Sequence, residues 1–301
     1  MKYENNTVKP KMLMRVVKHK FLLLAHKLFH NIKYEDAVAE AMAGIAGRWQ
    51  GEIDPVYSYL AMLDILKQAH ISGDGLEIGG GYSTILFCQL IDRNGLKIES
   101  IDMNPDKYLR IIPRSSVRRF VFERIRRIDR LSVSFVQVQK AYLETLPNKI
   151  RDYGDEKFLN ALLPFCKVQP KAENYIDVAA CIQESLGAQL LGLSLCEIEK
   201  QFYIENNLVK GEGYCSELVK RGREFDFVFF DCGEYSSLAE WFLLEEQIKV
   251  GGFALLHDIY FPKSVKNFIV AALISLSDKW EIIYVDRISP QGALVARRVS
   301  A

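Results

Sequence analysis

The stretch that decides the fold is Gly75-Leu76-Glu77-Ile78-Gly79-Gly80-Gly81-Tyr82-Ser83-Thr84. Its first residues predict a short buried strand and its three consecutive glycines predict a turn. The polar pair at its end predicts the start of a helix, which continues through the apolar run at residues 85 to 87. A strand that passes through a glycine turn into a helix is typical of the first unit of a doubly wound parallel sheet.

The glycine turn indicates a nucleotide or nucleoside site. Glycines at Gly79, Gly80 and Gly81 let the backbone approach a ligand, and a helix that begins at Ser83 and Thr84 presents free N–H groups to a polar or anionic group. A dinucleotide fingerprint expects another glycine where Thr84 stands, which weakens that interpretation. A tight turn in some other α/β fold stays open as the alternative.

A second predicted strand, residues 95 to 101, ends at Asp102 and is followed by Met103. Asp102 lies about 20 residues beyond the glycines, where a strand-end carboxylate can accept hydrogen bonds from both hydroxyls of a ribose. The spacing therefore supports a nucleoside ligand. The alternative is that Asp102 caps a helix that begins after Pro105.

Two further strands are predicted to end at the same edge of the sheet. Residues 223 to 230 form a continuous apolar run typical of a central parallel strand, and Asp231 follows it. Residues 253 to 256 form the next strand, followed by His257 and Asp258, so these polar groups point at one crevice. Residues 280 to 286 and 293 to 297 then predict a closing hairpin.

With these motifs in place, the sequence resembles the class I S-adenosylmethionine (SAM) methyltransferases. In that family an acid, a spacer and a glycine pair stand in the arrangement of Glu77, Ile78 and Gly79, and the last strand is antiparallel. The resemblance implies an α/β, Rossmann-like, doubly wound and mostly parallel sheet of seven strands. It also implies that Glu77 faces the amino group of the methionine moiety and that Asp231 contributes to the cofactor site.

Within the family, the run from Phe225 to Asp231, the following Gly-Gly and strand, and His257-Asp258 look similar to the macrocin O-methyltransferase-like enzymes. Relatives of this group often bind a divalent metal through acids after these two strands, which makes Asp231 and Asp258 candidate ligands of Mg²⁺. The metal would polarise an acceptor hydroxyl, and His257 or a carboxylate would take its proton.

The resemblance is incomplete after Asp231, where Cys232-Gly233-Glu234 stands in place of the Gly-Asp-His usual in the related enzymes. This departure puts the metal in doubt. The alternatives are that His257 is a structural histidine at a strand end and that Asp258 is a turn or cap carboxylate.

Residues 106 to 199 are too many for one crossover connection, so they predict a mainly helical insertion. Its first part is rich in arginine, which favours a solvated face paired with acids, with an anionic acceptor or nucleic acid as the alternatives. For the third core strand, residues 133 to 138 compete with residues 201 to 204, and we prefer the second. Glu205 or Asn206 could then reach an adenine amino group.

Residues 1 to 70 predict an N-terminal helical cap before a core at 71 to 301. A helix is expected at 8 to 46, and its surroundings are basic: residues 1 to 33 contain eight lysines or arginines and a single acid, Glu4. Such a helix could contact a membrane surface, although a packed cap, an active-site lid or a homodimer contact are the alternatives. A second helix is expected at 56 to 68.

The composition is that of an ordinary globular protein. The 301 residues are 49% hydrophobic and 26% charged, and the net charge of +1 gives no general case for binding nucleic acid. Six cysteines have no paired short spacing, and no apolar span of about 20 residues occurs, so we expect reduced thiols in a cytoplasmic protein.

The sequence therefore predicts a SAM-dependent methyltransferase. It would act on a hydroxyl, or less favourably an amine, of a small metabolite that could be anionic. Two alternatives remain. One is transfer of an aminopropyl or aminobutyryl group from SAM on the same fold, and the other is a non-catalytic protein that binds membrane or RNA.

Overall fold

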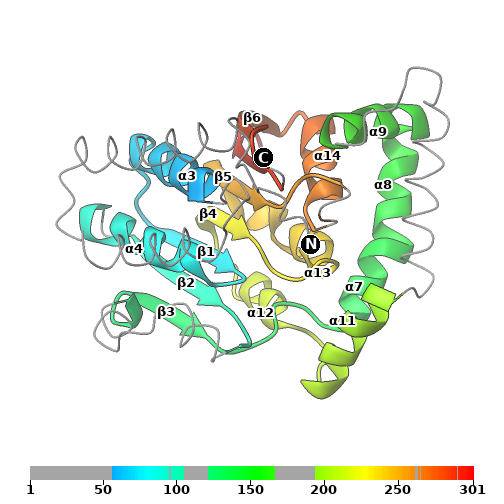
Figure 1. Cartoon of the computed structure of the whole chain (residues 1–301), viewed down its shortest axis with the longest axis horizontal. Helices are drawn as coiled ribbons and strands as arrows, with labels where there is room; N and C mark the ends of the chain where they lie inside the picture. The colour runs from blue at the N-terminus through cyan, green and yellow to red at the C-terminus, as the bar shows by residue number, and fades with distance from the viewer. Residues whose placement is uncertain are drawn as a thin grey trace, which may run out of the picture.

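The computed structural model describes residues 56–94, 96–104, 121–166, 194–261, 264, 266–289 and 291–301. Seven strands form one sheet in the order β3-β2-β1-β4-β5-β7-β6 (Figure 1). The strands are β1 (Asp74–Ile78), β2 (Lys97–Ile101), β3 (Ile125–Ile128), β4 (Phe225–Phe230), β5 (Ile248–His257), β6 (Trp280–Asp286) and β7 (Ala293–Arg298).

The sheet is doubly wound and mostly parallel, as predicted. Strands β1 to β5 pair in parallel, and β7 lies antiparallel between β5 and β6. The chain runs outward from β1 through β2 to β3 and then returns to place β4 on the other side of β1. The strand order therefore reverses between β1 and β4, which is where ligands bind in open sheets of this kind.

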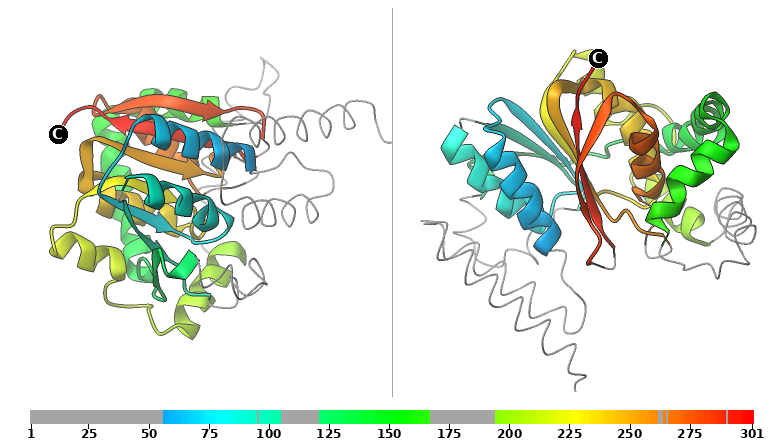
Figure 2. Two further views of the ribbon diagram at one scale, coloured as in Figure 1. Left: turned by 90° about the vertical axis from the view of Figure 1, so that its left-hand side faces the viewer. Right: turned by 90° about the horizontal axis from the view of Figure 1, so that it is seen from above.

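Helices cover both faces of the sheet (Figure 2). On one face lie α3 (Val56–Gln68) and α4 (Tyr82–Asn94), which pack against each other. The other face carries α12 (Tyr214–Lys220), α13 (Ser236–Leu244) and α14 (Phe268–Leu276). Outside this second layer the chain adds α7 (Phe135–Lys140), η1 (Ala141–Thr145), α8 (Leu146–Tyr153), α9 (Asp155–Leu162), η2 (Leu163–Phe165) and α11 (Ser194–Glu205), and η3 (Glu245–Gln247) precedes β5.

Strand β4 is the centre of the hydrophobic core. Phe227 and Phe229 pack with α3 and α4, whereas Phe225 and Phe230 pack with the helices of the other face. The β4–β5 register shifts between Phe225 and Phe227, where β5 carries the extra residues. All four rings are 0% exposed, and each contributes about 1.5–3 kcal/mol of burial free energy.

The prediction of the third core strand was wrong. Residues 201 to 204 lie in α11. Residues 133 and 134 precede α7 and residues 135 to 138 belong to it, whereas the strand beside β2 is β3. Strand β3 reads Ile-Arg-Arg-Ile, because it is an edge strand whose two arginines pair with acids, the buried Glu99 and the exposed Asp129. Arg126 pairs with Glu99 at 2.9 Å and Arg127 with Asp129 at 2.5 Å. The insertion that was predicted at 106 to 199 therefore contains a strand of the sheet.

The basic helix predicted at 8 to 46 lies outside the described residues, but α3 has the predicted bounds. The hydroxyl of Ser58 donates to Asp286 Oδ2 at 2.6 Å, and the same oxygen accepts from Ser289 at 2.6 Å. These bonds join α3 to the closing hairpin. Among the helices the structure describes, none is long and apolar enough to cross a membrane.

Candidate functional site

The carboxyl ends of the four parallel strands β2, β1, β4 and β5 lie side by side at one edge of the sheet. Asp102 follows β2, the glycine turn follows β1, Asp231 follows β4, and Asp258 follows β5. This edge includes the point between β1 and β4 where the strand order reverses. The chain has a Rossmann-like fold. Its candidate site is therefore at this edge of the sheet.

Gly79 is held tightly between the neighbouring strands. Its N–H donates to the carbonyl of Ile101 at 2.9 Å, and its φ is +87°. A Cβ at this position would lie 2.0 Å from the carbonyl oxygen of Asp231 and 2.8 Å from the amide nitrogen of Cys232. Only glycine fits here, so the turn brings the bare backbone of β1 against the end of β4.

Glu77 organises the turn from beneath. Its side chain is 0% exposed, and its two carboxylate oxygens accept from the hydroxyls of Ser83 at 2.5 Å, Thr84 at 2.6 Å and Ser100 at 2.5 Å. Thr84 Oγ1 also accepts from the N–H of Gly81 at 2.8 Å. Ser83 and Thr84 were predicted to lie at the ligand, and in this structure their hydroxyls are directed at Glu77. The role of Glu77 as the partner of a ligand ammonium stays a prediction.

Asp102 lies at the open end of β2. The carboxylate and its neighbour Met103 are partly exposed, and Asp102 Oδ1 accepts from the N–H of Asn104 at 2.7 Å. The backbone N–H of Asp102 donates to Ile128 of β3 at 3.1 Å, which fixes the strand end. A carboxylate at the surface of this edge can accept from a ribose diol.

Asp231 lies in a buried group of polar side chains from four different elements. Asp231 Oδ1 is 2.9 Å from the ammonium of Lys266, and Oδ2 accepts from the hydroxyl of Tyr59 at 3.1 Å. The same ammonium lies 2.8 Å from Asp258 Oδ2. Burial alone would raise the pKa of Asp231, but Lys266 and His257 hold it well below its usual range.

His257 is almost completely enclosed, with 4% of its surface exposed. Its Nδ1 is 3.1 Å from Asp258 Oδ1 and 3.4 Å from Asp231 Oδ1, and its ring centroid lies 4.8 Å from that of Tyr59. Burial would lower the pKa of His257, but the two carboxylates raise it to about 9. An imidazolium has no lone pair to accept a proton, so action of His257 as a base requires loss of this proton first.

Asn267 fixes the ends of β4 and β5 relative to each other. Its Nδ2 donates to the carbonyls of Phe230 at 2.9 Å and His257 at 2.6 Å. Asp258 has a φ of +60°, which is unusual for a residue with a side chain. Its N–H donates to Gly292 and its carbonyl accepts from the N–H of Asn267. The turn at Asp258 is thus held from two sides.

The three predicted ligands lie together, but the arrangement does not fit a divalent cation. Ligand atoms of Asp231, His257 and Asp258 lie within 4.8 Å of one another. The ammonium of Lys266 already contacts both carboxylates, at the position from which an ion would bridge them. The prediction of Mg²⁺ is therefore not supported by the donor set, and no step below depends on a metal.

The sequence did not indicate three residues of this site, Tyr59, Lys266 and Asn267. Conversely, Asn206 was predicted to follow a core strand but follows α11, and its Nδ2 donates to the carbonyl of Phe202 at 2.8 Å. The strand end on which its predicted contact with adenine depended does not exist, so that prediction is withdrawn.

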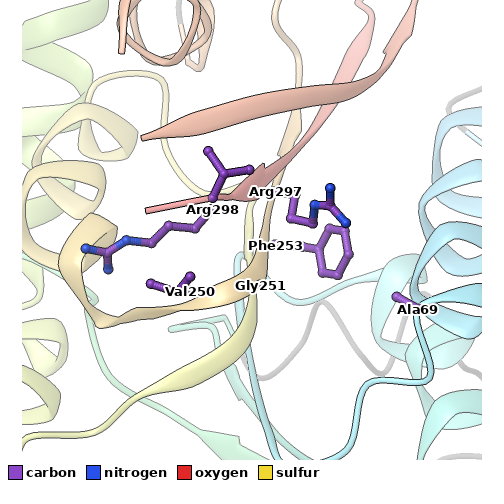
Figure 3. Close-up of a pocket in the computed structure, with 7 residues that line it drawn as sticks. Ala69, Val250, Gly251, Phe253, Arg297 and Arg298 are labelled. Carbon is purple, nitrogen blue, oxygen red and sulfur yellow. The ribbon is translucent and has the colours of Figure 1, made fainter. Parts of the chain in front are cut away.

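An open pocket lies at the other end of the sheet (Figure 3). Ala69, the start of β5 and the end of β7 line it. Arg297 and Arg298 extend to opposite sides of β7 there, and they pair with Glu281 and Glu246. The pairing of Phe253 with Arg297 and of His257 with Ala293 places this pocket away from the strand ends that carry the candidate site.

Comparison with known proteins gives structural likenesses only. No family model matches the chain, and no curated protein matches it. Among solved structures, the cofactor-bound protein Rv0187 from MTB is 14% identical and aligns over 94% of this chain and 97% of its own, with a TM-score of 0.48.

Two further solved structures are methyltransferases with a bound cofactor or cofactor product. An O-methyltransferase from Bacillus cereus in complex with SAH is 12% identical over 91% of this chain and 96% of its own, with a TM-score of 0.45. The O-methyltransferase TomG from Streptomyces achromogenes, in complex with SAM, is 11% identical over 92% and 95%, with a TM-score of 0.44. Likeness at this level does not assign an activity to this chain.

Proposed function

We propose that this protein is a SAM-dependent methyltransferase that acts on a hydroxyl of a small metabolite. The observation that carries the proposal is the edge of the sheet where the strand order reverses. There the glycine turn after β1, which opens helix α4, and the partly exposed carboxylate of Asp102 after β2 lie at neighbouring strand ends. A nucleoside cofactor needs both features, a turn with N–H groups at a helix start and an acceptor for its ribose diol.

The glycine turn and helix α4 would bind the amino-acid end of the cofactor. The buried Glu77 holds Ser83, Thr84 and Ser100 in place, so the backbone of the turn is fixed before any ligand arrives. A preorganised loop of this kind lowers the ordering cost of binding. Asp102 would accept from the two ribose hydroxyls, which orients the cofactor along the edge of the sheet.

SAM, when bound, supplies a methyl group that is transferred by in-line displacement at the sulfonium. The residues of this chain would position the acceptor oxygen and receive its proton. The ionised carboxylates of Asp231 and Asp258 are the groups at this edge that would receive the proton, whereas His257 would first have to lose its own. Because Lys266 and His257 favour ionised carboxylates, the buried group is charged and fixed before the acceptor enters.

Recognition of the acceptor would come from segments outside the sheet. We assign acceptor recognition to the N-terminal cap at 1 to 70 and to the long connection between β3 and β4. This connection includes most of the insertion that was predicted at 106 to 199. A cytoplasmic location, as expected from the scattered cysteines, would give access to small metabolites and to SAM.

Calorimetry with SAM and with its demethylated product, SAH, tests the proposal on the full chain. We expect one equivalent of each to bind, and Asp102→Ala to weaken binding about tenfold or more, since a hydrogen-bonded carboxylate contributes on the order of 1.5–3 kcal/mol. Asp152→Ala, a change at an exposed aspartate of α8, is the matched control and should bind like the parent. Absence of binding to both compounds would refute the proposal.

A further inference from the structure

The ammonium of Lys266 lies between the two carboxylates at the ends of β4 and β5. Its Nζ is 2.9 Å from Asp231 Oδ1 and 2.8 Å from Asp258 Oδ2, and the Lys266 side chain is 16% exposed. The carboxylates themselves are 15% and 8% exposed. A buried lysine that bridges two buried carboxylates at hydrogen-bond distance is a complete ion-pair site.

We propose that Lys266 is the resident cation of this site, so that the site works without a divalent metal. The four carboxylate oxygens each face a donor or a cationic neighbour. Lys266 contacts one oxygen of each carboxylate, the hydroxyl of Tyr59 donates to the second oxygen of Asp231, and Nδ1 of His257 lies 3.1 Å from the second oxygen of Asp258. Three of the four oxygens accept a hydrogen bond, and Asp258 Oδ1 lies beside the His257 ring without one.

Charge and distance both oppose a metal ion beside this lysine. Mg²⁺ requires oxygen ligands at about 2.0–2.1 Å in octahedral geometry, and Ca²⁺ requires six to eight at about 2.3–2.6 Å. An ion that bridged Asp231 and Asp258 at such distances would have to take the position of the ammonium. It would otherwise lie next to a like charge in a buried environment, where Coulomb repulsion is weakly screened. Lys266 would have to leave the site first.

The backbone around Lys266 holds the ammonium in place. The N–H of Lys266 donates to Ser264 Oγ at 3.2 Å, and Ser264 Oγ donates to Glu234 at 2.9 Å. The next residue, Asn267, is bonded to the ends of both strands that carry the carboxylates. The lysine is therefore fixed to the same strand ends as its partners. The proposal concerns the carboxylates alone and stands whether or not the protein transfers methyl groups.

Titration with Mn²⁺, followed by electron paramagnetic resonance on the full chain after treatment with a chelator, tests the proposal. We expect no saturable binding of Mn²⁺ to the parent protein at this site. Lys266→Met removes the ammonium but keeps an unbranched side chain, and it should create saturable binding of one Mn²⁺ because two carboxylates are left without their cation. Adding Asp231→Asn to that variant should abolish the gain.

Lys249→Met is the matched control, because Lys249 pairs with a single carboxylate, that of Asp226, at 2.9 Å. This variant should bind Mn²⁺ no better than the parent. Saturable binding of one Mn²⁺ to the parent that disappears in Asp231→Asn would overturn the proposal, and so would a folded Lys266→Met variant without any gain. The titration of the parent decides the question even if Lys266→Met does not fold, and it is read independently of SAM binding.

Discussion

Replacement of Gly79 by alanine tests whether the turn after β1 is fixed by close contact with β4. The new Cβ would lie 2.0 Å from the carbonyl oxygen of Asp231 and 2.4 Å from its carbonyl carbon. Both are backbone atoms, so no side-chain rotation can relieve the overlap. Strand β1 and strand β4 would have to separate at the point where the proposed ligand binds.

Two costs add in this variant. A non-glycine residue at a φ of +87° costs about 1–3 kcal/mol. Overlap in a packed environment adds about 1–3 kcal/mol more. The sum, about 2–6 kcal/mol, is a large part of a typical free energy of unfolding of about 5–15 kcal/mol. We therefore expect a severe loss of stability and of SAH binding.

Gly154 separates the two costs. It has the same φ of +87°, but a Cβ there would meet nothing within 4 Å. Gly154→Ala should therefore show only the conformational cost. We would measure the free energy of unfolding of both variants in urea by circular dichroism, and SAH binding by calorimetry. Equal destabilisation of the two variants, with SAH binding retained in Gly79→Ala, would refute the close-packing argument.

Three further substitutions test the surroundings of the site. Glu240 in α13 is 0% exposed, and burial raises its pKa to about 7 from an ordinary 4.5. The folded state thus binds this proton more strongly than the unfolded state, so the free energy of unfolding falls as the pH rises from 4.5 to 7. The free energy of unfolding of Glu240→Gln, measured in urea, should therefore rise relative to that of the parent by about 2–4 kcal/mol from pH 5 to pH 8. A difference between the two proteins that stays the same over this pH range would contradict this expectation. Ser58→Ala removes a donor to the buried carboxylate of Asp286 and should cost about 1–3 kcal/mol of unfolding free energy, whereas no loss would show that α3 is held by its apolar face alone. Asn267→Ala leaves two buried strand-end carbonyls without their donor and should lower the unfolding free energy by about 2–4 kcal/mol, so a loss under 1 kcal/mol would mean that water replaces the amide.

The central strands could be predicted because a strand that is buried on both faces has a continuous run of apolar residues. Strand β4 is a continuous apolar run, and its phenylalanines do pack against both helical layers. The glycine turn after β1 was equally readable, because Gly79 occupies a position that excludes every other residue. From these features the sequence also predicted that the polar residues after the strands lie at one edge of the sheet.

Edge elements could not be predicted in the same way. Strand β3 has two arginines between two isoleucines, so its sequence resembles a solvated surface until Glu99 of β2 is seen beside Arg126. Residues 201 to 204 were preferred as the third strand for their interval to the next strand, yet Phe202 and Ile204 are 42% and 45% exposed on helix α11. A short apolar run is compatible with a strand or with a helix, so its interval along the chain could not decide between them.

The ionic contacts within the site also could not be predicted from the sequence. Tyr59 and Asp231 are 172 positions apart, and Lys266 and Asp231 are 35 apart, so no local spacing joins them. Because Lys266 contacts both Asp231 and Asp258, these predicted metal ligands are instead the partners of an internal cation. Such a change depends on the position of one side-chain nitrogen, which only the folded chain defines.

A crystal structure of the full chain with SAH would show whether the cofactor binds at the proposed edge of the sheet. We expect density for SAH at the ends of β1 and β4, with its ribose hydroxyls within hydrogen-bond distance of Asp102 and its amino-acid end at residues 79 to 81. Binding of SAH elsewhere, such as in the pocket beside Arg297, with these strand ends left without ligand, would refute the proposed site.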